Sequence, residues 1–187
     1  MSRPLKLKAL CHLGFTVIDI DEWFTQWGDN LGCTERHVHR ETATGGILVN
    51  GIDHGFTDVS VAFTRMGGLP VELIQTHGGR TTHLDWLEQH GPGLHHVAFW
   101  VDDIDAEVRA ATELGMQILM APKGLGRAVV STDVSVPDST NLTIPNIFAF
   151  LGLPTANEPW TLELLDVGLI DEYRRLNGDL PGYPENA

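Results

Sequence analysis

One short pattern occurs twice in this sequence, and the repeat constrains the fold more than any other feature. Residues 12–21 read HLGFTVIDID and residues 96–105 read HVAFWVDDID. Each copy begins with a histidine, continues with alternating apolar residues and ends in acidic residues suited to the start of a helix. We therefore expect two copies of one structural unit, each with a histidine on its first strand.

A glutamate lies in the middle of a later predicted strand in each copy, within the segments VELI and LELL. Taken alone, each of these histidines and glutamates is more typical of an ordinary strand residue than of a ligand. Their matched positions favour a joint role, because imidazole and carboxylate groups together suit a divalent metal ion. The repeat therefore predicts a metal site with four ligands: His12, Glu72, His96 and Glu163.

The composition excludes several classes of function. The chain has 187 residues and a formal net charge of −13, which argues against binding to nucleic acid or to an anionic membrane surface. No apolar run approaches the roughly 18 residues of a membrane span, and the basic start lacks an apolar leader segment, so we expect a cytoplasmic protein. Cys11 and Cys33 are expected to be reduced and buried, without a catalytic role.

The pattern of elements predicts an α+β fold made of two β-α-β-β-β modules that pack with pseudo-twofold symmetry around a metal-bearing cavity. We expect the first module at residues 1–80 and the second at residues 94–167. A linking helix and a Gly-Pro-Gly break occupy residues 81–93 between them. Residues 168–187 form a C-terminal extension with a short helix at 169–176 and an extended or frayed end.

The expected elements follow the same order in both modules. The first has a helix near residues 22–31, a Gly-rich loop at 44–55 with a short strand at 47–49, and main strands at 9–18, 35–42, 59–64 and 70–76. The second has a helix at 104–114, a loop at 135–145, and strands at 95–101, 116–120, 128–134, 147–151 and 160–167. A further helix is expected from residue 81 to residue 90.

Alternation along the two repeated strands assigns their faces. His12 and Gly14 share one face of the first strand, and His96, Ala98 and Trp100 share one face of the second. The other faces, which carry Phe15 and Phe99, are expected to pack against the helices. Each histidine is thus accompanied by a small residue two positions later.

The remaining histidines are expected to have structural or solvated positions. His37 and His39 alternate on a strand but are flanked by arginines, which favours a solvated face. His95 points away from His96 by alternation and is expected to pack or to form a hydrogen bond. His54, His77, His83 and His90 are expected in loops or on helix surfaces. The sequence has no dinucleotide-binding loop, no Walker-type phosphate loop and no nucleophile-elbow serine.

Residues 86–105, WLEQHGPGLHHVAFWVDDID, resemble the central segment of methylmalonyl-CoA epimerases. These belong to the vicinal-oxygen-chelate superfamily with glyoxalase I, extradiol dioxygenases and bleomycin-resistance proteins. The resemblance extends over most of residues 9–167. It implies the same four ligands, with His96 as the metal-facing member of the histidine pair, and a divalent cofactor that the sequence leaves open among Zn, Ni, Co, Mn and Mg.

Two positions separate the relatives within that resemblance. A glutamate at position 72 is similar to glyoxalase I and to some epimerases, and it argues against the iron extradiol enzymes. Epimerases often place a second acid on the strand that here reads VSVAF, at residues 59–63, where this chain has no carboxylate. Asp58 and Glu41 are the alternatives for such an acid.

The function expected from these residues is that of a metal-dependent isomerase, epimerase or glyoxalase-type lyase. Such an enzyme removes a proton next to a carbonyl of a small oxygenated or acyl-thioester substrate, and the metal stabilises the resulting enolate. We expect Glu163 first and Glu72 second as the base, and we consider a homodimer. The expected substrate-binding residues are Lys123, Arg127 and Trp100. A non-catalytic small-molecule-binding protein of the same fold is the alternative, and a dioxygenase is a more distant one.

Overall fold

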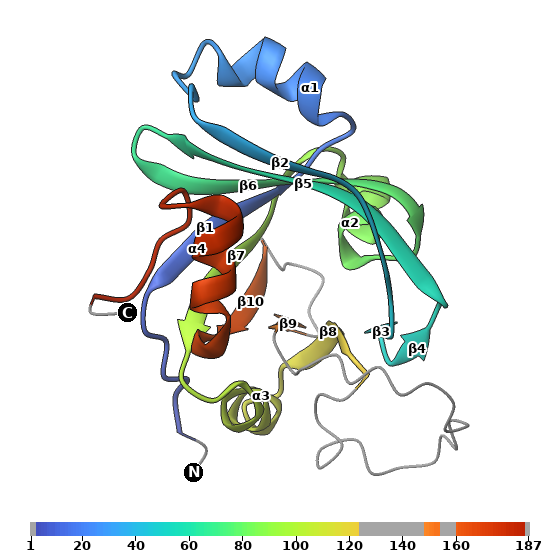
Figure 1. The fold of residues 1–187 in the computed structure, drawn as a ribbon. Coiled ribbons are helices and arrows are strands. Elements are labelled where there is room, and N and C mark those ends of the chain that lie inside the picture. Colours follow the sequence, from blue (N-terminus) through green and yellow to red (C-terminus); the bar gives the residue numbers. More distant parts are fainter. Residues whose placement is uncertain (1–2, 124–147, 154–159, 186–187) are drawn as a thin grey trace.

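The computed structural model describes residues 3–123, 148–153 and 160–185, with the backbone alone at 41–44 (Figure 1). It shows a mixed α+β fold with one curled sheet and a few helices around it. The ten strands that it describes follow the order β2-β5-β6-β1-β7-β10-β9-β8-β3-β4. The predicted strand at 128–134 and the predicted loop at 135–145 lie outside the described residues.

The first module contributes one half of this sheet. Its main strands are β1 (Leu10–Thr16), β2 (Arg36–Gly45), β5 (Phe56–Met66) and β6 (Leu69–Gly79). The helix α1 spans Ile20–Trp23 and continues as a π-helical turn over Phe24–Gly28. Asp19 begins it, because its Oδ1 accepts a hydrogen bond of 2.8 Å from the backbone N–H of Glu22.

The second module has the same order of elements. Its strands are β7 (Gly93–Val101), β8 (Gln117–Pro122), β9 (Phe148–Gly152) and β10 (Thr161–Asp166). The helix α3 spans Ile104–Glu113. Asp103 caps its start by accepting a 2.9 Å hydrogen bond from Ala106 N–H, and Gly115 follows its end with a φ of 90°.

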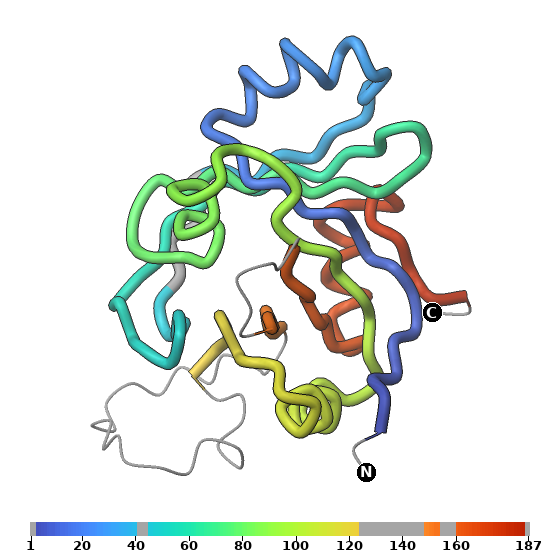
Figure 2. The backbone as a smooth tube through the Cα atoms, turned by 180° about the vertical axis from the view of Figure 1, so that it is seen from behind, coloured from blue at the N-terminus to red at the C-terminus, as the bar shows by residue number. Residues whose placement is uncertain are grey.

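The two halves of the sheet meet symmetrically at its centre. β1 and β7 run antiparallel beside each other, as the blue and green tubes in Figure 2 show. Each is flanked by the last strand of its own module in parallel, β6 beside β1 and β10 beside β7. Phe15 packs with the core under α1 and Phe99 with the core under α3, which confirms the predicted helix-facing sides.

A small hairpin extends the edge of the second module with strands from the first. Strand β3 (Ile47–Val49) matches the prediction, while β4 (Ile52–Asp53) was expected to be loop. The turn between them has positive φ at both central residues, 50° at Asn50 and 76° at Gly51. These values favour a type I′ hairpin, for which Asn-Gly is the preferred pair. β3 then pairs with β8.

Each module is followed by a helix. The helix α2 (Thr82–His90) follows β6, and α4 (Ile170–Asn177) follows β10 after a 3₁₀ turn at Val167–Leu169. In Figure 1, α4 is drawn over the central strands β1 and β7, and α2 lies to their right. None of the helices in the described part of the chain is long and apolar enough to span a membrane.

The end of the chain packs against the sheet, where the sequence predicted an extended or frayed end. Leu180 is only 1% exposed, and Gly182 N–H donates a hydrogen bond of 2.6 Å to the carbonyl of Cys11. The Tyr183 hydroxyl donates to the carbonyl of Gly178 at 2.8 Å. The segment has no helix or strand, but the prediction of a frayed end was wrong, because the backbone groups of this polar, Pro- and Gly-containing segment find partners on β1 and within the segment itself.

Candidate metal centre

The strand registers bring the four predicted ligands to one face of the sheet. Across β1 and β7, Gly14 stands opposite His96 and His12 stands opposite Ala98. Glu72 on β6 lies beside Gly14, and Glu163 on β10 lies beside Ala98. Because laterally paired residues point to the same side of a sheet, all four ligand side chains converge.

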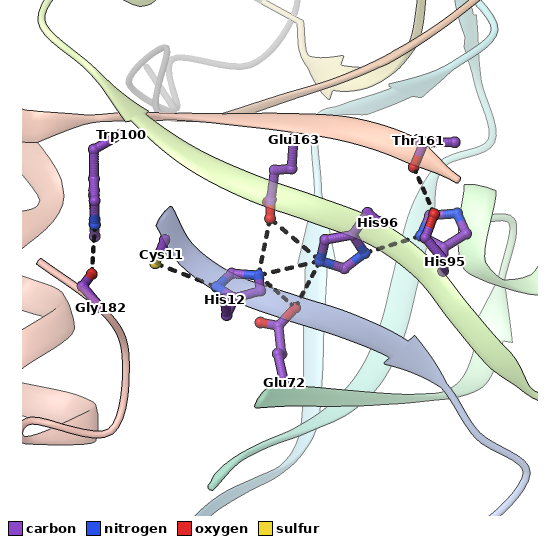
Figure 3. Close-up of polar contacts among 9 residues, drawn as sticks. All are labelled: Cys11, His12, Glu72, His95, His96, Trp100, Thr161, Glu163 and Gly182. Atoms are coloured by element: carbon purple, nitrogen blue, oxygen red, sulfur yellow. Dashed lines mark hydrogen bonds and ion pairs between the residues drawn. The ribbon is translucent and has the colours of Figure 1, made fainter. Parts of the chain in front are cut away.

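The donor atoms of these side chains lie at the separations of metal ligands (Figure 3). The two histidine Nε2 atoms are 3.1 Å apart. Oε2 of Glu72 lies 3.2 Å from each Nε2, and Oε2 of Glu163 lies 3.1 Å from that of His12 and 3.3 Å from that of His96. A metal about 2.0–2.2 Å from each ligand atom holds neighbouring atoms roughly 3.0–3.6 Å apart. The set therefore fits one divalent ion.

The burial of the four side chains supports the same conclusion. Both histidines are 0% exposed, and Glu72 and Glu163 are 6% and 5% exposed. Among the described residues, no group forms a hydrogen bond of acceptable geometry with Oε2 of Glu163. An unpaired buried carboxylate costs several kcal/mol, and a cation between the four donor atoms would remove that penalty.

The protein environment favours the charged forms of two ligands when no metal neutralises them. Burial lowers the pKa of His12, but the charge of Glu72 and the contact with Cys11 outweigh it and leave that pKa well above its usual value. Burial raises the pKa of Glu72, and the opposing effect of His12 leaves it below its usual range. The centre thus attracts positive charge to its middle.

The small residues of the repeat make room for the rings. A Cβ atom at Gly14 would lie 1.9 Å from Cε1 of His96, far inside van der Waals contact. Ala98 takes the corresponding place opposite His12. The small residue two positions after each histidine therefore accommodates the histidine of the other module.

Two phenylalanines that the sequence analysis did not select form apolar walls around the centre. Phe63 pairs with Glu72 across the strands, and its ring centroid is 5.5 Å from that of His12. Phe150 pairs with Glu163, and its ring centroid is 5.0 Å from that of His96. The alternation of side chains along these two strands is the sequence signal that could have identified both phenylalanines. They exclude water and strengthen electrostatic interactions at the centre.

The helices α2 and α4 each add a polar side chain near the centre. His83 from α2 lies with its ring centroid 5.6 Å from that of His96, and burial lowers its pKa to about 3. The prediction that His83 lies on a helix surface was wrong, because the first turn of α2 faces the sheet and leaves it 3% exposed. Tyr173 from α4 packs on Phe63, and burial followed by Glu163 raises its pKa well above the usual value.

The three expected substrate-binding residues have different positions. Trp100 lies on the predicted face, but it is 0% exposed, and its indole N–H donates a 2.7 Å hydrogen bond to the carbonyl of Gly182. We therefore correct its expected role, because the C-terminal segment covers the ring. Lys123 pairs with Asp53 of the β3–β4 hairpin. Arg127 lies outside the described residues.

The two alternating histidines of β2 have partners in the C-terminal helix. His37 Nδ1 is 3.1 Å from the carbonyl of Leu176, and His39 Nε2 is 2.8 Å from Oδ1 of Asn177. The predicted solvated face is therefore only partly correct, because both side chains are half-buried against the end of α4. The sequence could not show this contact, because β2 and α4 are separated by more than a hundred residues.

Of the two alternatives for a second acid, Asp58 lies far from the centre. Asp58 stands opposite Gly78. That position is roughly 20 Å along β6 from Glu72, at the usual rise per strand residue. The side chain of Glu41 is not among the described ones.

Comparison with known proteins agrees with this fold. Residues 11–132 match the glyoxalase/bleomycin resistance protein/dioxygenase superfamily, and the chain belongs to that superfamily. An uncharacterized protein of Bacillus subtilis, YqjC, is 27% identical over 114 residues, which cover 60% of this chain and 71% of that protein.

Two solved structures are similar to this chain, and the first of them illustrates the shared fold. The methylmalonyl-CoA epimerase of Mycobacterium tuberculosis matches with a TM-score of 0.51 and 18% identity, over 89% of this chain and 92% of that one. A hypothetical protein from Bacillus halodurans matches with a TM-score of 0.49 and 20% identity, over 86% of this chain and 95% of that one. At these identities the similarity concerns the fold.

Proposed function

We propose that this protein is a metal-dependent enzyme that removes a proton next to a carbonyl of a small oxygenated or acyl-thioester substrate. The observation that carries the proposal is the convergence of two imidazoles and two carboxylates on one buried point, with donor atoms 3.1–3.3 Å apart. When bound, a divalent metal supplies a Lewis acid that stabilises negative charge on a substrate oxygen.

The chain's own residues divide the remaining work. His12 and His96 hold the metal with neutral nitrogen atoms from the two central strands. Glu163 is the first choice for the base, because its buried Oε2 has no hydrogen bond of acceptable geometry among the described residues. Glu72 is the second choice. Phe63 and Phe150 exclude water from the charges that change during proton transfer.

The number of bases decides the reaction type. One carboxylate that takes and returns the proton on the same side favours an isomerase or lyase of the glyoxalase type. Two carboxylates acting from opposite sides favour an epimerase. Glu72 and Glu163 come from different modules and flank the two central strands. The same two glutamates are therefore available for a one-base or a two-base reaction.

Exchange of substrate protons with deuterated water tests this function. The metal-loaded protein is incubated with methylmalonyl-CoA or with the hemithioacetal of methylglyoxal and glutathione, and exchange is followed by NMR. Glu163→Gln keeps the shape of the side chain but removes the base, so we expect exchange to fall about 10²-fold or more. Glu113→Gln, on the exposed end of α3, is the matched control and should exchange at the wild-type rate.

The outcomes separate an enzyme from a binding protein of the same fold. Exchange by the wild type that is lost only in Glu163→Gln supports the proposal. A wild-type protein that binds a metal but exchanges neither substrate contradicts it and leaves the small-molecule-binding alternative.

A further inference from the structure

The Nδ1 atom of each histidine in the candidate metal centre contacts the side chain of the residue that precedes it in the chain. Nδ1 of His96 lies 3.0 Å from Nδ1 of His95, and Nδ1 of His12 lies 3.2 Å from Sγ of Cys11 (Figure 3). His95 is 1% exposed and Cys11 is 0% exposed, so no bulk water competes for these contacts.

The position of the metal fixes the direction of the hydrogen bond to His95. A histidine that binds a metal through Nε2 carries its ring proton on Nδ1 and donates it to an outer partner. Nδ1 of His96 is therefore the donor, and Nδ1 of His95 must be the acceptor. His95 then carries its own proton on Nε2.

The surroundings of His95 hold its ring in place for this contact. The rings of His83 and Trp86 pack against it at centroid distances of 4.5 and 5.6 Å. The Thr82 backbone forms a hydrogen bond with the same ring. The Thr161 hydroxyl donates a 3.1 Å hydrogen bond to the His95 carbonyl, which ties the start of β10 to β7 at this residue.

We propose that His95 is a positioning residue of the metal centre, which fixes the tautomer and orientation of His96 by accepting a hydrogen bond from its Nδ1. The inference rests on the proposed metal centre and adds an outer partner to it. An imidazole nitrogen is a stronger acceptor than a thiol sulfur, so His95 contributes more to metal binding than Cys11 does.

Zinc affinity of the full-length protein, measured by competition with a chromogenic chelator, tests the proposal. His95→Phe keeps a planar ring but removes the acceptor, and we expect zinc to bind 10- to 100-fold more weakly. His95→Gln supplies an amide oxygen as acceptor and should restore most of the lost affinity. Thermal unfolding with a chelator present shows that each variant is folded without the metal.

Trp86→Phe is the matched control. Trp86 packs against the ring of His95 with a centroid distance of 5.6 Å, and a phenylalanine keeps an aromatic ring at that position. The control should therefore keep the wild-type zinc affinity. Equal losses in Trp86→Phe and His95→Phe would reduce the effect to packing and would overturn the proposal, as would an unchanged affinity in His95→Phe.

The wild-type protein gives a second readout that needs no variant. Nitrogen-15 NMR of the zinc-loaded protein should show Nδ1 of His96 protonated and Nδ1 of His95 unprotonated. The reverse assignment would overturn the role of His95 while leaving the metal centre intact. A wild type that binds none of Zn, Ni, Co, Mn and Mg would instead overturn the proposed function itself.

Discussion

The two modules of this protein agree in the residues that surround the metal centre and differ in what lies behind them. Each supplies a histidine, a glutamate and a phenylalanine at matching places, and each is followed by a helix that reaches the centre. They differ at the small residue, Gly14 against Ala98, and at the outer partner, Cys11 against His95. The two modules thus share the residues that supply the donor atoms, whereas the residues that contact the histidine rings differ between them.

The outer helices differ more than the strands do. α3 is a regular helix of 10 residues that buries Val108 and Ala111 completely. α1 has only 4 residues before it widens into a π-helical turn, and Trp27 in that turn remains 58% exposed. The sheet holds the donor atoms in place from both modules, so this difference lies away from the centre.

The largest effect is expected from exchanging the small residues. Gly14→Ala places a methyl group in the volume of the His96 ring, so we expect zinc binding to be lost and the free energy of unfolding to fall by about 1–3 kcal/mol. Ala98→Gly removes a methyl group and should keep zinc binding. Chelator competition and urea unfolding measure both. Zinc binding by Gly14→Ala at the wild-type affinity would contradict the claim that position 14 must lack a side chain to accommodate His96.

A smaller effect is expected at the outer partner of His12. Cys11→Ser keeps an acceptor for His12 Nδ1, whereas Cys11→Ala removes it, so zinc should bind more weakly to the alanine variant. Because sulfur is a weak acceptor, the loss should be smaller than in His95→Phe, about 10-fold at most. A larger loss in Cys11→Ala than in His95→Phe would reverse the order of the two partners.

The helix α4 is followed by a tail that packs against the sheet, whereas α2 leads directly into β7. Trp100→Phe removes the hydrogen bond to Gly182 but keeps a buried aromatic ring. We expect the free energy of unfolding to fall by about 1 kcal/mol and limited proteolysis of the tail to accelerate. Trp86→Phe, on α2, should leave the tail protected. Unchanged proteolysis in Trp100→Phe would show that other contacts hold the tail.

The smallest effect concerns an ion pair that ties the start of the chain to α3 of the second module. Arg3 donates two hydrogen bonds, of 2.7 and 2.8 Å, to Glu107 on α3. They hold the pKa of Glu107 below its usual value against the opposing effect of burial. The pair therefore stabilises the fold above the unfolded-state pKa of a glutamate, and the effect is lost as the pH falls through the lowered pKa.

Acid unfolding followed by circular dichroism measures this contribution. Glu107→Gln should be less stable than the wild type at neutral pH. Its stability should also depend less on pH below about 5, because the titrating carboxylate is gone. Asp21→Asn, which breaks the exposed pair with Arg40 in the first module, is the control and should change little. Identical pH dependence in Glu107→Gln and the wild type would contradict the assignment.

The sequence was sufficient for the residues whose role follows from strand alternation and from the repeat. The convergence of the four predicted ligands, the face of Trp100 and the contacts of Phe15 and Phe99 all follow from a period of two, and the role of the four residues as metal ligands stays a prediction. The expectation that His95 packs or forms a hydrogen bond was also confirmed, but the expectation that it points away from His96 was wrong, since the Nδ1 atoms of the two rings lie 3.0 Å apart. The pairing of β1 with β7 shifts register at this residue, which interrupts the alternation.

The remaining features depend on contacts between distant parts of the chain. His83 faces inward because of how α2 turns back onto the sheet, and the helical pattern alone does not give that direction. The tail was expected to fray, because its composition is that of a loop, whereas its backbone is held by β1 and Trp100. Tyr173 reaches Phe63 only through the packing of α4.

Elemental analysis of the purified protein after loading and dialysis tests the central claim most directly. The account predicts about one equivalent of divalent metal per chain in the wild type and a loss of that metal in His12→Ala and His96→Ala alike, because the two modules share one centre. A wild type that retains no Zn, Ni, Co, Mn or Mg would contradict it.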